Sequence, residues 1–234
     1  MLDPIPKPSA PAWEISQESG ILTLAFPHAR EESSLLYQIG KWTNAMPNYE
    51  CRSDIVQAIQ QRLQCMIDRY CRTYLVRLDI RFPHGYVAMN ANEKFSELMK
   101  QLKEYYTYHQ VATQYVGVRE QNTSENPHYH VALLFDGSKV DNGWAVGEKA
   151  AGIWQVIVGL GAGVHRCEFA GKYGIKIVRP KFKAVGLDLQ TQQAAFRAAC
   201  HEAMTWLSYL AKTATKGCAP PNARELFCSR LPVR

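Results

Sequence analysis

The stretch TQYVGVREQNTSENPHYHVALLF (residues 113–135) decides the fold of this chain. Its two ends, 113–120 and 128–135, are rich in Val, Tyr, Leu and Phe, and the seven-residue loop QNTSENP separates them. β-Branched and aromatic runs joined by a short polar loop predict a β-hairpin. If the two strands pair symmetrically about the loop, Glu120 lies directly opposite His128.

The second strand of this hairpin opens with His128-Tyr129-His130. Residues i and i+2 of a strand share a face, so the two imidazoles lie about 6.5–7 Å apart at the backbone. Together with Glu120 they predict a His-His-Glu metal site with open positions for phosphate oxygens or water. Chance produces roughly 0.2 H-x-H patterns in a chain with this histidine content, so two surface histidines are the alternative. The apolar strand that follows the pair favours the metal site.

Residues 73–82, TYLVRLDIRF, alternate strictly between apolar and polar positions. The pattern predicts a strand with an apolar face and a polar face, the latter formed by Arg77, Asp79 and Arg81. Asp79 has two interpretations, because it can support the metal site or pair with a neighbouring arginine. The ion pair is favoured.

Helical spacing of apolar residues indicates four helices, with Ser53-Asp54 as the expected cap of the first. The expected helices are 53–70, 93–106, 144–158 and 189–213. Two further strands are expected at about 164–169 and 173–179. This mixed order with adjacent antiparallel strands predicts an α+β fold in which helices flank a central antiparallel sheet.

Tyr209 and Lys212 lie near the end of the last expected helix, where positions i and i+3 share a face. A phenol has a pKa near 10 and is a poor nucleophile at neutral pH, but a metal and a nearby ammonium favour its attack. A packed tyrosine and a solvated lysine are the alternative. A second Y-x-x-K, Tyr173 to Lys176, lies in an alternating segment that places its two side chains on opposite faces, so it is rejected.

Basic residues concentrate in the C-terminal part of the chain. Residues 1–150 hold 15 Lys and Arg against 17 Asp and Glu, whereas residues 151–234 hold 12 against 4. Basic side chains interleaved with aromatic rings are typical of a surface for single-stranded nucleic acid, although a solvated basic strand is the alternative. The expected DNA-binding residues are Lys172, Lys176, Arg179, Lys181, Lys183 and Lys216.

The composition indicates a globular, cytoplasmic protein. Apolar residues make up 47% of the chain, no run approaches the ~20 apolar residues that span a bilayer, and the start lacks the pattern of a signal peptide. Seven cysteines without a C-x-x-C pair argue against a disulfide framework and against a zinc knuckle. The expected division is a Pro-rich lead-in and extension over 1–52, a domain over 53–217 and a tail over 218–234.

Three ordered motifs, VRLDIRFP, VREQ…NPHYHVALLF and WLSYLAKTATK, resemble the replication initiators of filamentous phages (inoviruses) and their prophage relatives of the YagK/YfjJ C-terminal type. That family resembles a branch of the HUH endonucleases, which start rolling-circle replication. The similarity runs from about Ile55 to Lys216.

The resemblance implies a five-stranded antiparallel sheet with the H-x-H on a central strand and the tyrosine helix packed across it. His128 and His130 match the metal-binding pair, for Mg²⁺ or Mn²⁺, while Tyr209 matches the nucleophile and Lys212 the basic residue that follows it. The implied product is a 5′-phosphotyrosine link and a free 3′-OH for a polymerase. Positions 205 and 213 are both Thr, which implies a single catalytic tyrosine.

The implied partners are single-stranded DNA at a replication origin and the polymerase and helicase of a bacterial host, because the chain carries no helicase-like nucleotide-binding motif. Two other functions stay open at this point. One is a DNA-binding regulator that has the fold but no catalysis. The other is a metallohydrolase that activates water at His128 and His130, with Tyr209 in a structural role.

Overall fold

The computed structural model describes residues 50–87, 90–121, 126–181, 188–213, 220 and 223–232, and the backbone of two short strands before them. The chain divides into two compact units, residues 1–48 and 49–234. In the first unit, β1 (Leu22–Leu24) and β2 (Tyr37–Ile39) pair antiparallel. The rest of the expected lead-in, up to residue 49, lies outside the described residues.

The second unit contains four α-helices among its described residues: α1 (Ser53–Arg69), α2 (Ala91–Tyr108), α3 (Gly143–Val158) and α4 (Leu189–Ser208). A 3₁₀ turn, η1 (Tyr209–Ala211), follows α4. The strands are β3 (Arg72–Arg81), β4 (Thr113–Glu120), β5 (His128–Asp136), β6 (Gly163–Arg166), β7 (Ile175–Val178) and β8 (Leu226–Cys228). The α+β fold predicted from the sequence is confirmed.

The strands of this unit form one antiparallel sheet in the order β6-β3-β5-β4-β8. Both β6 and β7 pair with the same edge of β3. β6 pairs with residues 78–81 and β7 with residues 72–75. The sheet therefore has six strands, one more than the resemblance implied. The additional strand, β8, comes from the segment that the sequence assigned to a C-terminal tail, and it pairs with β4.

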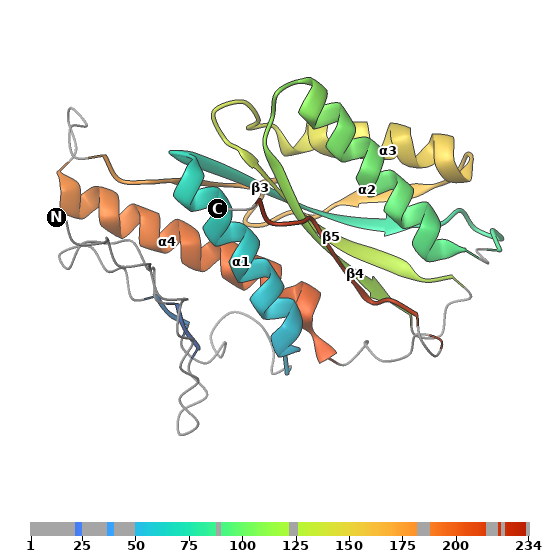
Figure 1. Cartoon of the computed structure of the whole chain (residues 1–234), viewed down its shortest axis with the longest axis horizontal. Coiled ribbons are helices and arrows are strands. Elements are labelled where there is room, and N and C mark those ends of the chain that lie inside the picture. The colour runs from blue at the N-terminus through green and yellow to red at the C-terminus, as the bar shows by residue number, and fades with distance from the viewer. Residues whose placement is uncertain are drawn as a thin grey trace, which may run out of the picture. The chain divides into compact units, whose positions relative to one another are not determined.

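One face of the sheet is apolar and is covered by α2 and α3 (Figure 1). Alternate residues of β3 and β5 point into this core, as the period of two requires. Tyr129, the middle residue of H-x-H, is fully buried there, with its ring stacked on Phe95 at 4.1 Å between centroids. Packing of the middle residue on one face fixes both histidines on the other face.

The opposite face of the sheet carries α1 and α4 (Figure 1). The sequence predicted that Arg77 and Asp79 lie on a polar face of β3, yet both are buried, at 8% and 9% exposure. The predicted alternation of β3 is present, but Arg77 and Asp79 lie beneath helices and form part of a buried polar cluster. A buried charge is costly unless it is paired, so each of these side chains requires partners.

The ends of two helices differ from the prediction. Ser53 is the first residue of α1, and the residue before it, Arg52, is the cap; its side chain donates to the carboxylate of Asp54 and does not cap the helix backbone. α4 ends at Ser208, and the chain then tightens into η1, because the backbone at Lys212 leaves the helix and forms a bridge with Cys51. Among the described residues, none of the helices combines the length and the apolar run that crossing a membrane requires.

Candidate metal centre beside a tyrosine

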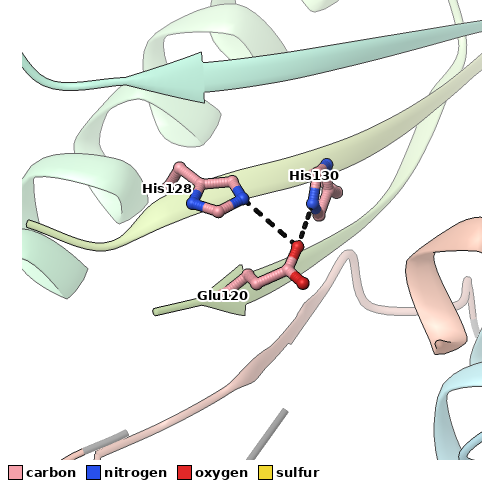
Figure 2. Close-up of side chains that lie close together, drawn as sticks. All are labelled: Glu120, His128 and His130. Atoms are coloured by element: carbon pink, nitrogen blue, oxygen red, sulfur yellow. Dashed lines mark hydrogen bonds and ion pairs between the residues drawn. The ribbon is translucent and has the colours of Figure 1, made fainter. Parts of the chain in front are cut away.

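Glu120, His128 and His130 bring one ligand atom each to a common point, with these atoms within 4.8 Å of one another. The register of the hairpin places Glu120 opposite His128, as predicted. The Nε2 atoms of both histidines face the same carboxylate oxygen of Glu120, at 3.2 Å for His128 and in a shorter contact for His130 (Figure 2). The three residues come from the adjoining ends of β4 and β5.

Asp79 lies on the other side of His130. It is opposite His130 in the pairing of β3 with β5, and its Oδ1 accepts a hydrogen bond from Nδ1 of His130 at 2.6 Å. The same oxygen lies 3.7 Å from Nη2 of Arg77. The favoured ion pair of Asp79 with an arginine is therefore present, but the shorter contact of Asp79 is with His130, so both interpretations of Asp79 have an observed contact.

The ionisation of this pair follows from its surroundings. Burial lowers the pKa of His130, but hydrogen bonds to Asp79 and Glu120 outweigh burial and raise the pKa above its ordinary value. Burial raises the pKa of Asp79, but the hydrogen bond from His130 and the charges of His130 and Arg77 outweigh it and lower the pKa. The two carboxylates on either side of His130 thus favour its imidazolium form more than water does.

The donor set of one carboxylate and two imidazoles could hold a divalent metal ion. Because Nδ1 of His130 donates to Asp79, Nε2 is the ring nitrogen that faces Glu120, and it would bind a metal ion once its own proton is lost. His128 is the open member of the group: its side chain is 27% exposed, against 3% for His130 and 6% for Glu120. The group is therefore open to solvent on the His128 side.

Tyr209, the predicted nucleophile, lies beside this centre. Its ring packs edge-to-face on His130, with 5.3 Å between centroids. The expected helical pairing with Lys212 is not formed, because η1 ends at Ala211 and the backbone leaves the helix at Lys212. Nζ of Lys212 lies 5.9 Å from the centre of the Tyr209 ring, so the two predicted residues remain neighbours.

Arg77 is a residue of this site that the sequence analysis treated only as a pairing partner. Its guanidinium carbon lies 4.1 Å from the centre of the Tyr209 ring, and its side chain is 9% exposed. A buried cation over an aromatic face is an attractive contact. Arg77 therefore links the tyrosine to Asp79, and through Asp79 to His130. The alternating pattern of β3 placed Arg77 two residues from Asp79 but gave no sign of the tyrosine above it.

The predicted DNA-binding cations do not share one environment. Lys172, Lys176 and Lys181 are exposed, although Nζ of Lys176 lies 3.7 Å from Asp141. Arg179 is exposed as well, but its guanidinium donates to the carbonyl oxygen of Asp68 at 3.0 Å and so caps the end of α1. Two further predicted residues, Lys183 and Lys216, lie outside the described residues. Their role in DNA binding stays a prediction.

The model of the YagK/YfjJ C-terminal domain matches residues 39–225 of the chain. This range covers the metal centre and Tyr209 and ends one residue before β8. Neither the curated proteins nor the solved structures include a significant match to the chain.

Proposed function

The chain belongs to the YagK/YfjJ C-terminal domain family, and from its site we propose that it is a metal-dependent endonuclease of the HUH kind, which nicks and rejoins single-stranded DNA. The observation that carries the proposal is the packing of Tyr209 on His130, the residue at the centre of the His-His-Glu group. A hydrolase that activates water at a metal needs no tyrosine there. A nickase needs a nucleophile next to the phosphate.

The proposed reaction is a transesterification. The phenol oxygen of Tyr209 bonds to the scissile phosphorus while the bond from phosphorus to the 3′ oxygen breaks. The phenol proton passes to solvent, and the leaving 3′ oxygen takes up a proton to become a free 3′-OH. Attack by a 3′-OH on the phosphotyrosine reverses the step and rejoins a strand. The link between phosphate and tyrosine thus keeps the energy of the broken phosphodiester bond until the strands are joined.

A divalent ion, when bound to Glu120, His128 and His130, polarises the phosphate oxygens and favours attack by a weak nucleophile. The protein's own residues orient the groups. Asp79 fixes the ring of His130 through Nδ1, and the guanidinium of Arg77 holds the tyrosine ring against that histidine. Lys212, whose Nζ lies 5.9 Å from the centre of the Tyr209 ring, supplies a second positive charge beside the tyrosine.

The biological role that we propose is the start of rolling-circle replication of a phage, prophage or plasmid element. The nick leaves a 3′-OH that a host polymerase extends, while a host helicase unwinds the duplex. The origin-containing single strand is then the substrate, and the exposed basic residues around β7 are candidate contacts for it.

A cleavage assay on labelled single-stranded DNA with Mn²⁺ tests this proposal. The substrate is a pool of random-sequence oligonucleotides, and cleaved products are recovered and sequenced to find the preferred site. His130→Ala is expected to abolish cleavage while sparing DNA binding, because the metal serves the chemistry more than the affinity. His109→Ala, a change at an exposed histidine after the end of α2, is the matched control and is expected to cleave normally.

The outcomes separate the candidate functions. Binding without cleavage by the wild type, in any metal, supports a non-catalytic DNA-binding regulator and contradicts the nickase. Cleavage that persists in Tyr209→Phe supports a hydrolase that activates water and contradicts the role of the tyrosine.

A further inference from the structure

The open side of the metal centre is bordered by β3 as well as by the hairpin. In the pairing of β3 with β5, Arg81 lies directly opposite His128, the exposed ligand. Residues that face each other across antiparallel strands lie about 4.5–5.5 Å apart at Cα and share a face of the sheet. Arg81, His128 and Glu120 thus form one row across three strands.

Arg81 differs from Arg77, which lies four positions earlier on the same face of β3. Arg77 is buried between Asp79 and the tyrosine, whereas Arg81 is exposed at the end of β3. Across the described part of the chain, no carboxylate lies within 4.0 Å of the Arg81 guanidinium, although ion pairs hold Arg52 and Arg166. Arg81 is therefore a cation beside a metal centre without a structural partner of its own in this region.

Strand β6 pairs with β3 on the side away from β5 and leaves room next to Arg81. Gly163 of β6 is the residue opposite Arg81 in that pairing. A Cβ added at Gly163 lies 3.5 Å from Cβ of Arg81 and 4.0 Å from its carbonyl oxygen, which are ordinary contacts, and meets nothing else within 4 Å. The surface beside Arg81 is thus open toward β6 as well as toward His128.

We propose that Arg81 binds a phosphate of the single-stranded DNA substrate next to the metal centre. This assignment rests on the proposed function and adds to it the position of the strand, which crosses the end of β3 from His128 toward Gly163. A guanidinium matches the geometry of a phosphate through two parallel N–H donors, and its charge is not neutralised by a protein carboxylate here. Arg81 acts in binding and orientation, while the metal ligands and Tyr209 act in the chemistry.

The test measures binding of a fluorescein-labelled oligo-dT of 20 nucleotides by fluorescence anisotropy, in EDTA and over a series of salt concentrations. Arg81→Ala is expected to weaken binding about five- to tenfold and to reduce the slope of log affinity against log salt by about 0.7, the value for one phosphate contact on a single strand. The matched control is Arg72→Ala, at the other, equally exposed end of β3. It is expected to match the wild type in both quantities.

Two further variants separate charge from geometry. Arg81→Lys keeps the positive charge, so it is expected to keep the salt slope while losing part of the affinity. Gly163→Val keeps Arg81 but places a branched side chain beside it, and is expected to weaken binding. Titration with Mn²⁺ is expected to give the wild-type affinity for all of these variants, which shows that the fold and the metal centre are intact.

The assignment is overturned if Arg81→Ala and Arg72→Ala have equal effects, or if the wild type does not bind the oligonucleotide. Because binding is measured without metal, the result does not depend on cleavage. A protein that binds through Arg81 but never cleaves contradicts the nickase and leaves the phosphate contact standing. Normal binding and cleavage by Arg81→Ala contradict the phosphate contact and leave the nickase standing.

Discussion

Nδ1 of His130 donates a hydrogen bond to Oδ1 of Asp79 at 2.6 Å, so a carboxylate from β3 orients a metal-ligand candidate on β5. The two residues are 51 positions apart in the chain and opposite each other in the sheet. A carboxylate behind a histidine fixes its tautomer and makes its other nitrogen a better ligand. Glu120, His128 and His130 could therefore hold a metal ion, with Asp79 behind His130 to orient its ring.

Replacement of Asp79 by Asn is expected to weaken Mn²⁺ binding about 10- to 100-fold, because the amide retains an acceptor but loses the charge that favours a basic Nε2. Isothermal titration calorimetry measures the affinity. Asp68→Asn, an exposed site on α1, is the control and is expected to bind like the wild type. Equal affinities for Asp79→Asn and the wild type would mean that Asp79 does not support the centre.

Mn²⁺ is expected to stabilise the folded chain, since an ion that binds only the native state shifts unfolding by mass action. At a free concentration 100 times Kd the gain is about 2.7 kcal/mol, which raises Tm by about 5–10 °C in a chain of this size. Differential scanning fluorimetry with and without EDTA measures the shift. His130→Ala is expected to show no shift and His109→Ala the full shift. A full shift in His130→Ala would place the ion elsewhere.

The thiols of Cys167 and Cys200 are expected to resist alkylation in the folded chain. Burial raises the pKa of each to about 12, so that very little thiolate exists at pH 8, and both side chains are inaccessible. Cys71 is exposed and is expected to react first. Peptide mass spectrometry after brief iodoacetamide treatment, with a urea-unfolded sample for comparison, measures the order. The thiol of Cys167 shares a hydrogen bond with the Asp79 side chain, so early labelling of Cys167 would show that the buried polar cluster around Asp79 opens readily.

Gly143 and Gly152 are expected to respond to alanine in opposite directions. A Cβ at Gly143, the first residue of α3, would lie 2.1 Å from the carbonyl oxygen of Tyr173, so Gly143→Ala is expected to cost about 1–3 kcal/mol. Gly152 lies within α3 with nothing within 4 Å of the added atom, and Gly152→Ala is expected to gain about 0.5–1 kcal/mol. Urea denaturation measures both, and a neutral Gly143→Ala would contradict the close packing of α3 on the turn before β7.

Local patterns predicted the hairpin and the register of its two strands. The β-branched and aromatic content of 113–120 and 128–135 and the length of the loop between them are enough to place Glu120 opposite His128, because pairing in a hairpin is a local property. The apolar face of β3 was predictable as well, since apolar residues alternate along 73–82.

Contacts between distant segments were not predictable in the same way. The alternation of β3 shows that Arg77 and Asp79 share a face, but whether solvent or helices cover that face depends on the packing of α1 and α4. The partner of Asp79 depends on the pairing of β3 with β5. The position of Arg77 over Tyr209 depends on where α4 ends. Strand β8 is only three residues long and carries too little pattern to be recognised.

The most direct test of the nickase is the identity of the residue that becomes linked to DNA. Wild-type protein is incubated with Mn²⁺ and single-stranded DNA that carries the cleavage site, denatured, digested with protease and nuclease, and analysed by tandem mass spectrometry. The result that we predict is a nucleotide attached through its 5′-phosphate to Tyr209, present in the wild type and in His109→Ala and missing in Tyr209→Phe and His130→Ala. An adduct on another residue, or cleaved DNA with no adduct at all, would contradict the account.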